Sequence, residues 1–444
     1  MADLDAIKRP KLLDTSKVPD PVLGDAPLTG ERYYSKEYMQ KEWDKLWTKT
    51  WLIAGLDAQI PKVGDFITAK IGIESIICVR GKDKKVRAFY NVCPHRGNRL
   101  IDDASGNKKA IACRYHGWRF DLDGDLKLAP CAEDFPQGNP CGKLKLSEIP
   151  CEVWSGFIWY SLDENALPLA EHLGPIKHQV ESYQMDNMKR IHWTTVEGDF
   201  NWKIPQDNFN ESYHLPFVHP QAKYSLEQSY EHCQFDMYEG LGHTRMQMPG
   251  DRPSEALKGE IDTIMEAMHN QLKFWELDPE EFRDNPLKMR AALQKAKRER
   301  GAEKGFDYSG FVDDQLTDHF HYILFPNLSL SLKPDGCIFT QSNPHPTDPT
   351  KSYFDFWYLI WFPKDHEEYY CYVMSETFKA DFQPEHVQGP WPEASCGPAI
   401  DQDVEVWNSQ QLGLQSRGFK REYLSGQESR VRFWHETLDH MLES

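Results

Sequence analysis

Short apolar runs, each bounded by turn residues, dominate the stretch from Trp51 to Leu162. Val, Ile, Phe, Tyr and Trp are frequent within the runs, and Gly-Lys-Asp or Asp-Gly sequences separate them, which is typical of short antiparallel strands. The stretch therefore predicts a small all-β module, followed by a linker at residues 163–168. Strands are expected within residues 71–80, 86–93, 114–126 and 152–162.

The rest of the chain mixes strand-like and helical patterns. A Pro334-Asp335-Gly336 sequence predicts a hairpin turn. Residues 254–304 are highly charged with helical spacing, and helices are also expected at residues 35–47 and 428–442. Further strands are expected within residues 189–197, 322–332 and 353–362. Together these patterns predict an α+β protein.

Composition narrows the class of protein. The chain has 444 residues and is 40% hydrophobic and 27% charged, enough for two or more domains with large cores. A net charge of -18 argues against nucleic-acid or membrane partners. No signal peptide is recognisable at the N-terminus, and no apolar run approaches the ~18–20 residues of a membrane span. A cytoplasmic protein is expected, so its ten Cys favour reduced thiols or metal ligands over disulfides.

Four candidate metal ligands fall on two loops of the β module. Cys93-Pro94-His95 and Cys113-Arg114-Tyr115-His116 each supply one Cys and one His. A structural zinc site is the alternative, but zinc sites usually pair Cys with Cys and His with His along the chain. One Cys and one His from each loop suit a two-iron cluster, in which one iron takes both Cys and the other both His. Trp118 in the second loop is placed to limit solvent.

A second constellation lies in the stretch from Asn201 to Pro220. His214 and His219 are five residues apart, so on an unbroken helix they would point about 140° apart. Pro216 lies between them and ends or kinks a helix. His214 at the end of one helix and His219 after the following turn would then converge on one ion. Glu211, three residues before His214, shares its helix face and could orient the imidazole. The alternative is two unrelated histidines.

These motifs give the chain its resemblance to a known family. Residues 51–162 resemble the Rieske [2Fe–2S] domain, and residues 201–220 resemble the iron site of Rieske non-haem oxygenases. The second resemblance is carried by Asn201, Trp202, Lys203, Asp207, Asn208, Glu211, Tyr213, His214 and His219. The family's third iron ligand is a distant carboxylate in a segment similar to GPAIDQDVEVWNSQQLGL (397–414). Asp403 aligns best with it, and Asp401 and Glu405 are competitors.

The resemblance implies a fold and a domain plan. An all-β Rieske domain is expected beside a helix-grip (START-like) catalytic domain, with a large antiparallel sheet and covering helices. Residues 1–50 would form an arm and helix, 51–162 the Rieske domain and 163–444 the iron domain. The implied cofactors are a [2Fe–2S] cluster and a mononuclear Fe(II), with O2 as co-substrate. Their implied ligands are Cys93, His95, Cys113 and His116 for the cluster, and His214, His219 and Asp403 for the iron.

The resemblance also implies an activity and partners. The chain would be the terminal oxygenase component, which hydroxylates a small organic substrate by cis-dihydroxylation or monohydroxylation. An aromatic substrate is expected. Oxidative O-/N-demethylation or C–N cleavage is one alternative, and a Rieske electron carrier with a ligand-binding domain is another. No nucleotide-binding G-x-G-x-x-G follows a strand, so NAD(P)H would act only through a separate reductase, with or without a ferredoxin. A homotrimer, with or without a small β-subunit, is expected.

Further site residues follow from the same resemblance. Glu211 would bridge His214 to His116 of the partner subunit, and it stands where ring dioxygenases carry Asp and carnitine-type monooxygenases carry Glu. Asp207 and Asn208 would lie beside the iron ligands. Substrate contacts are expected from residues that flank the iron ligands or match the family's pocket: Phe209, Leu215, Phe217, Val218, Phe325, Asn327 and Leu330.

Overall fold

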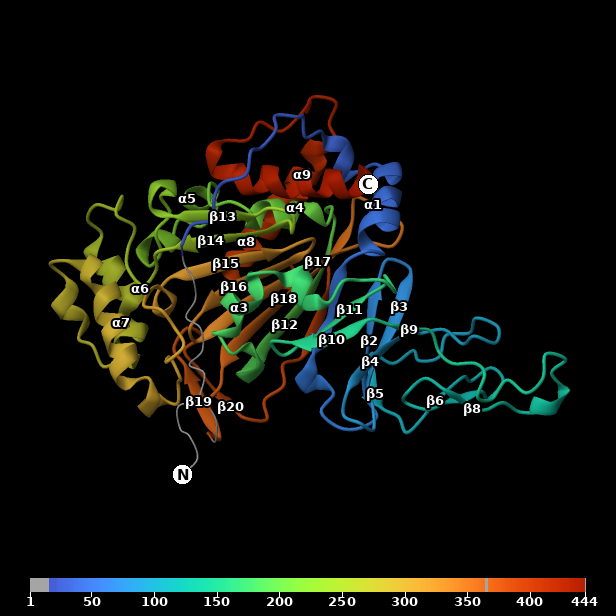
Figure 1. Ribbon diagram of the computed structural model, residues 1–444. Helices are drawn as coiled ribbons and strands as arrows, with labels where there is room; N and C mark the ends of the chain where they lie inside the picture. The colour runs from blue at the N-terminus through green and yellow to red at the C-terminus, as the bar shows by residue number, and fades with distance from the viewer. Residues whose placement is uncertain (1–15, 364–365, 444) are drawn as a thin grey trace. The chain divides into compact units, whose positions relative to one another are not determined.

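The computed structural model describes residues 16–363 and 366–443, in two compact units (Figure 1). The smaller unit comprises residues 40–174, and the larger comprises residues 175–443 with the described residues before 40. Residues 1–15 lie outside the described residues. They include part of the expected N-terminal arm and the segment in which no signal peptide was predicted.

The smaller unit is built from short antiparallel strands, as its turn-rich pattern predicts. A five-stranded sheet has the order β5-β2-β3-β4-β9, and two three-stranded sheets have the orders β1-β11-β10 and β6-β7-β8. Residue 71 ends β2 rather than starting β3, because Gly72 turns the chain at φ 53°. The strands are β1 (Trp51–Leu56), β2 (Asp65–Ile71), β3 (Glu74–Arg80), β4 (Val86–Tyr90), β5 (Ser105–Asn107), β6 (Ile111–Ala112), β7 (Arg119–Phe120), β8 (Leu126–Leu128), β9 (Glu148–Ile149), β10 (Cys151–Trp154) and β11 (Phe157–Ser161).

An eight-stranded sheet forms the larger unit, in the order β13-β14-β15-β16-β17-β18-β12-β21. All neighbours are antiparallel except β12 and β21. The sheet strands are β12 (Met188–Gly198), β13 (Gln234–Tyr238), β14 (His243–Met248), β15 (His319–Leu324), β16 (Leu328–Lys333), β17 (Gly336–Pro344), β18 (Ser352–Trp361) and β21 (His386–Gly389), and β19 (Glu368–Cys371) with β20 (Glu376–Lys379) forms a separate hairpin. The expected α+β architecture with a large antiparallel sheet is confirmed.

The run at residues 322–332 forms two strands instead of the single one expected. β15 ends at Leu324 and β16 begins at Leu328, and the two pair as a hairpin. Pro326 lies in the turn, where its missing N–H leaves no gap in the strand ladder. The predicted turn at Pro334-Asp335-Gly336 joins β16 to β17.

Helices pack against the large sheet (Figure 1). Trp407 and Val404 pack against Phe354 and Phe356, so the core lies between one sheet face and α8. The charged stretch 254–304 contains α6 and α7, as predicted. The helices are α1 (Lys36–Glu42) and α2 (Leu169–Leu173), then α3 (Ile176–Glu181), α4 (Lys203–Phe209), α5 (Leu215–Val218), α6 (Ile261–Phe274), α7 (Met289–Arg300), α8 (Pro398–Leu414) and the terminal α9 (Ser429–Glu443).

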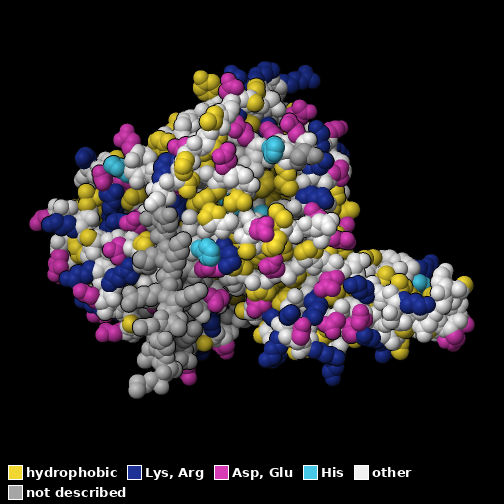
Figure 2. Space-filling model, in the orientation of Figure 1, with side chains coloured by type: hydrophobic (Ala, Val, Ile, Leu, Met, Phe, Trp, Pro, Cys, Tyr) yellow, Lys and Arg dark blue, Asp and Glu magenta, His cyan; other side chains and the backbone are white. Residues whose placement is uncertain are grey.

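The surface carries both signs of charge. On the face drawn in Figure 2, Lys and Arg side chains are interspersed with Asp and Glu. In the described part of the chain, no helix has the length and apolar character needed to cross a membrane.

Candidate metal centres

One short helix brings His214 and His219 together. His214 directly precedes α5 and His219 directly follows it, whereas the sequence placed His214 at the end of a helix. Pro216 stands in the first turn of α5, where a helix does not need its N–H group. The α5 segment is a single turn, so it reverses the chain and leaves the two imidazole rings 5.3 Å apart.

Asp403 reaches the same point from α8. Its Oδ1 lies 2.9 Å from His219 Nε2 and 3.7 Å from His214 Nε2. One ligand atom from each of the three residues falls within 4.8 Å of the others. The Asp403 side chain is only 2% exposed. Two imidazole nitrogens and a carboxylate on one side of a common point match the facial set of ligands that leaves coordination positions open on iron.

The other nitrogen of each imidazole faces an oxygen. His219 Nδ1 lies 2.9 Å from Gln402 Oε1, and His214 Nδ1 lies 2.6 Å from Glu211 Oε1. Each Nδ1 therefore donates its proton, which leaves Nε2 with a lone pair. A lone pair on His219 Nε2 and another on Asp403 Oδ1, 2.9 Å apart, require a positive species between them. The donor set therefore fits a metal ion.

The electrostatics of His219 agree with this arrangement. Burial lowers the pKa of the imidazole, but the hydrogen bond and the negative charge of Asp403 raise it above its ordinary value overall. Since the Asp403 carboxylate favours positive charge on its imidazole neighbour, it also favours a bound cation.

The two competing acids on α8 lie elsewhere. Asp401 accepts hydrogen bonds from the Ser395 hydroxyl and from the Cys396 backbone N–H. Glu405 is exposed. Residues two apart on a helix differ by about 200°, so neither acid can share the direction of Asp403.

The Cys/His quartet lies on two loops of the same shape. Gly97 N–H donates to the Cys93 carbonyl, and Gly117 N–H donates to the Cys113 carbonyl, both at 3.0 Å. Both glycines have positive φ, 70° and 74°, a conformation that costs other residues energy. The loops thereby present one Cys and one His each, in matching positions.

The quartet separates by residue type. Cys93 and Cys113 are 2% exposed, while His95 and His116 are half-buried with ring centroids 4.7 Å apart. Among the described residues, three or more His, Cys, Asp or Glu ligand atoms converge within 4.8 Å at only two places, and neither includes the quartet. A single zinc ion would need all four atoms close together, so a pair of irons, one facing the Cys and one the His, fits better.

An indole shields the histidine side of the quartet. Trp118 is 2% exposed and stacks on the His95 ring at 4.6 Å with an interplanar angle of 7°. Burial raises the pKa of the Cys93 thiol, as expected where water is excluded. The expectation that Trp118 limits solvent agrees with these contacts.

Asn208 and Asp207, both expected beside the iron ligands, lie in different surroundings. Asn208 is half-buried, and its Nδ2 is a buried donor without a partner. Asp207 instead bonds to Tyr33 and His435, in a second cluster of ionisable groups. The hydrogen bonds of Asp207 therefore lie within this second cluster, and its expected place beside the iron ligands stays a prediction.

Phe209 is the best placed of the expected substrate contacts. Its ring stacks on His321 at 5.6 Å and contacts Trp407 at 5.9 Å. Leu215 packs against a separate apolar cluster with Phe235. Val218 is half-buried beside His219.

The other expected contacts are not gathered around Phe209. Phe217 is 81% exposed. Phe325 packs against Trp434 of α9. Asn327 uses its amide to bind the backbone of β17. Leu330 lies on the opposite face of β16 from Ser329, since successive strand side chains alternate. The substrate contacts expected of these residues stay predictions.

Two site residues escaped the sequence analysis. His321 faces Phe209, and its Nε2 lies 3.2 Å from the Ser329 hydroxyl. Gln402 holds His219, and its position directly before Asp403 was the only available signal.

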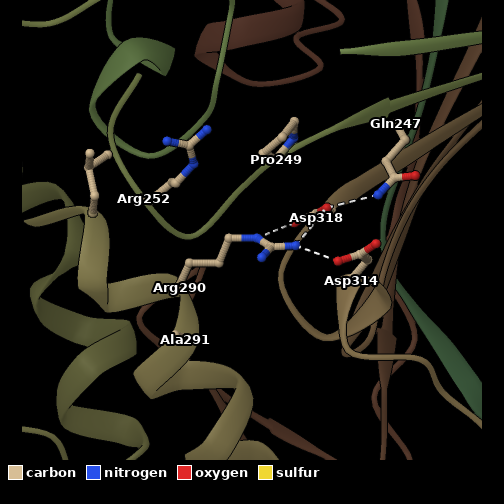
Figure 3. Close-up of a pocket in the computed structure, with 8 residues that line it drawn as sticks. Gln247, Pro249, Arg252, Arg290, Ala291, Asp314 and Asp318 are labelled. Carbon is tan, nitrogen blue, oxygen red and sulfur yellow. Dashed lines mark hydrogen bonds and ion pairs between the residues drawn. The ribbon is translucent and has the colours of Figure 1, made fainter. Parts of the chain in front are cut away.

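A surface cavity lined by residues of β14 and α7 lies apart from these centres (Figure 3). Its volume is about 430 Å³. Arg290 binds both Asp314 and Asp318 there, and Arg252 binds Glu227. With these charges paired, the cavity offers little to an ionic ligand.

Fold and site together define a protein with a Rieske cluster domain and a separate mononuclear iron domain. The chain belongs to the ring hydroxylating alpha subunit family, whose catalytic domain model matches residues 185–444. The Rieske [2Fe-2S] domain model matches residues 50–145. These matches imply a [2Fe–2S] cluster and a mononuclear iron as the cofactors.

Curated relatives share about a third of the aligned residues. The glycine betaine monooxygenase oxygenase subunit of Pseudomonas aeruginosa is 34% identical over 196 residues, which is 44% of this chain and 45% of the relative. The carnitine monooxygenase oxygenase subunit of Escherichia coli is 32% identical, over 44% of this chain and 52% of the relative. The 2,4-dinitrotoluene dioxygenase large oxygenase component of Burkholderia is 34% identical, over 45% of this chain and 46% of the relative. The chain spans about half the length of the curated relatives it matches.

Solved structures share the fold across nearly the whole chain. A quaternary ammonium Rieske monooxygenase superposes with a TM-score of 0.67 at 20% identity, covering 96% of this chain and 99% of that one. Naphthalene 1,2-dioxygenase from Rhodococcus gives a TM-score of 0.62 at 18% identity, covering 94% of both chains.

Proposed function

We propose that this chain is the terminal oxygenase component of a Rieske oxygenase system, which hydroxylates a small organic molecule with O2. The observation that carries the proposal is the convergence of His214, His219 and Asp403, whose ligand atoms lie within 4.8 Å of one another. Family membership and the second, Rieske centre support it.

The chain's own residues prepare each centre. Gln402 and Glu211 fix the tautomers of His219 and His214, so that each Nε2 is free to bind metal. Cys93 and Cys113 would hold one iron of the cluster, and His95 and His116 the other. When bound, the mononuclear iron offers positions for O2 and the cluster supplies single electrons.

Aromatic side chains pack together on the side of the proposed iron site formed by α8. Trp407 lies one helical turn after Asp403, and its ring contacts Phe354 at 4.9 Å and Phe209 at 5.9 Å. The three rings exclude water from this side, where a substrate would meet O2. Aromatic faces also attract a quaternary ammonium group, which carries positive charge without hydrogen-bond donors.

Buried hydroxyl groups share this sheet face. Thr340 pairs with Phe356 across the strands and Ser342 pairs with Phe354, so both hydroxyls face the same side as those rings. Both are fully buried, and their oxygens have no hydrogen-bond partner. Such groups need a polar ligand or water, which a hydrocarbon cannot replace.

We therefore infer that the substrate is a small quaternary ammonium compound rather than the aromatic compound expected from the sequence. The names of the glycine betaine and carnitine monooxygenase relatives support this inference, as does the Glu at position 211. Monohydroxylation leading to C–N cleavage is the corresponding outcome. A nitroaromatic substrate is the second candidate, favoured by the 2,4-dinitrotoluene dioxygenase relative.

Partners follow from the same proposal. A separate reductase, with or without a ferredoxin, would supply electrons, and a homotrimer would bring each cluster beside a neighbour's iron. Glu211, whose carboxylate binds His214 Nδ1 at 2.6 Å, would then bridge His214 to His116 of the partner subunit.

The test is substrate-dependent O2 consumption by the purified holoenzyme with a Rieske reductase. Glycine betaine, carnitine, 2,4-dinitrotoluene and naphthalene would be compared, with product identification. The proposal expects coupled turnover of a quaternary amine. Turnover of aromatic compounds alone would overturn the substrate class, and a fully loaded protein that oxidises none of a broad panel would favour an electron carrier.

A further inference from the structure

A second cluster of ionisable side chains lies inside the larger unit. The Tyr33 hydroxyl lies 2.6 Å from Asp207 Oδ2, 2.7 Å from Glu422 Oε1 and 3.1 Å from His435 Nε2. His435 Nε2 also lies 2.8 Å from Asp207 Oδ1. We call these four residues the Tyr33 cluster. It joins the N-terminal segment, α4, the loop after α8, and α9.

Arg32 determines where the proton of His435 lies. Its guanidinium lies 3.0 Å from His435 Nδ1. A guanidinium has only donors, so Nδ1 must accept. The neutral imidazole therefore carries its proton on Nε2 and donates it to Asp207. Burial, with the positive charge of Arg32, lowers the pKa of His435 to about 3 and keeps the ring neutral.

This proton position excludes a metal ion, although the three ligand types could hold one. A metal would need the lone pair of His435 Nε2, and it would leave Nδ1 with a proton directed at Arg32. Metal-bound imidazoles instead donate their second N–H to an oxygen. The Tyr33 cluster is therefore organised around protons.

Counting protons shows that one carboxyl group is neutral. The Tyr33 hydroxyl has one proton, which can point along only one of its two short contacts with carboxyl oxygens. The other contact, between two oxygens within 2.7 Å, needs a proton of its own. That proton belongs to Asp207 or Glu422, which then donates to the Tyr33 oxygen.

The surrounding charges agree with the count. Burial raises the pKa of Asp207 to about 7, against lowering by the Tyr33 hydrogen bond and by Lys203 and Arg32. Burial and the charge of Asp207 raise the pKa of Glu422. The other charged groups that act on the cluster are Glu211, which follows α4 and raises the pKa of Asp207, and Asp439 of α9, which binds Arg32.

We propose that Asp207 and Glu422 share one proton across the Tyr33 hydroxyl, and that this shared proton holds the N-terminal segment against α4 and α9. Loss of the proton would leave two buried carboxylates competing for one hydroxyl, and a buried unpaired charge is costly. The N-terminal segment is therefore held less tightly against α4 and α9 as the pH rises. α4 leads directly into the Glu211–His219 segment, so the shared proton would hold the helix that precedes the iron ligands.

Infrared spectroscopy of the holoenzyme tests the shared proton directly. A protonated carboxyl group has a carbonyl band that a carboxylate lacks. Near pH 6 we expect this band in the wild type, with a decrease as the pH passes neutrality. Glu422→Gln supplies an amide N–H in place of the shared proton, so the band should weaken and its neutral pH dependence should disappear. Glu436→Gln, an acid on α9 that binds only a backbone N–H of Gly24, is the control and should match the wild type.

A second measurement guards against a variant that fails to fold. Asp207→Asn replaces the other carboxyl and should weaken the same band. Hydrogen exchange at residues 30–34, corrected for the intrinsic effect of pH, should accelerate above neutral pH in the wild type and stay constant in Glu422→Gln. A wild-type spectrum without the band at pH 6, or a band unchanged in both variants, would overturn the proposal.

Discussion

Two clusters in the larger unit contain nearly the same side chains and bind different things. One has His214, His219 and Asp403, and the other has His435, Asp207 and Glu422. In the first, the second nitrogen of each imidazole faces an oxygen acceptor. In the second, that nitrogen faces a guanidinium donor. The partner of the second nitrogen decides whether the first presents a lone pair or a proton.

Ligand type alone therefore does not identify a metal site. Both sets bring their ligand atoms within 4.8 Å of one another, and each includes carboxylates and imidazole. Only the orientation imposed by Gln402 and Glu211 on one side, and by Arg32 on the other, separates a cation site from a proton site. Substitutions in each cluster test that separation.

Removing the carboxylate of the first cluster should have the largest effect. Asp403→Ala is expected to lose the mononuclear iron and all turnover, because two imidazoles alone hold the ion poorly, while the cluster's visible spectrum stays intact. Metal analysis and product formation measure this. Asp401→Ala is the matched control on the same helix and should keep its iron. Full activity in Asp403→Ala would show that the ligand is misassigned.

Glu211 should have an intermediate effect. Glu211→Gln retains the reach of the side chain but loses its charge, so both metals should stay bound while product formation slows by about 10–100-fold. Steady-state turnover and coupling of O2 use to product are the measurements. Glu405→Gln, an exposed acid on α8, should leave both unchanged. An unchanged rate in Glu211→Gln would refute the role of its charge.

The second cluster should make stability depend on pH. Burial raises the pKa of Asp207 in the folded protein to about 7, from an ordinary value of 3.8. A raised carboxyl pKa means that the folded state holds its proton more tightly than the unfolded state. The stabilisation is therefore complete below pH 4 and is lost as the pH rises toward 7, by on the order of a few kcal/mol. The measurement is the thermal midpoint of wild type and of Glu422→Gln between pH 5 and 8. The two midpoints should agree at low pH and separate as the pH rises, because only the wild type loses the stabilising proton. Midpoints that agree at high pH and separate at low pH would contradict this direction.

The ion pair between Asp439 and Arg32, at the edge of the second cluster, should have the smallest effect on stability. Asp439 is 36% exposed and pairs with Arg32 at 3.2 Å. Asp439→Asn should lower the free energy of unfolding by less than about 1 kcal/mol, since solvent screens such pairs. Thermal unfolding measures it. A loss as large as that of Tyr33→Phe would show that Arg32 needs Asp439 to hold His435.

The histidine pair of the proposed iron triad could be predicted because its information is local. His214 and His219 lie five residues apart with Pro216 between them, and the loops around Cys93 and Cys113 repeat one pattern. The choice of Asp403 over Asp401 and Glu405 rested instead on the resemblance of residues 397–414 to the family's third-ligand segment. The apolar run at residues 322–332 likewise predicted a strand before the Pro334-Asp335-Gly336 turn, whereas no run was identified for β17 after it.

The Tyr33 cluster could not be predicted because its members meet only in the folded chain. Tyr33 contacts residues 174, 389 and 402 positions away. Asp207 sits within the iron-site motif, and only the direction of its side chain on α4 assigns it to the second cluster. Side-chain direction matters in the same way on β16, where Leu330 and Ser329 are neighbours in sequence but lie on opposite faces of the strand.

The most direct test of the comparison is the iron and acid-labile sulfide content of purified protein, measured for the wild type, Asp403→Ala and Glu422→Gln. A [2Fe–2S] cluster with one further iron predicts an iron-to-sulfide ratio of about three to two in the wild type and in Glu422→Gln. The ratio should fall to about two to two only in Asp403→Ala. A wild-type ratio of about one, or loss of metal on changing Glu422, would contradict the assignment of metal to one cluster and protons to the other.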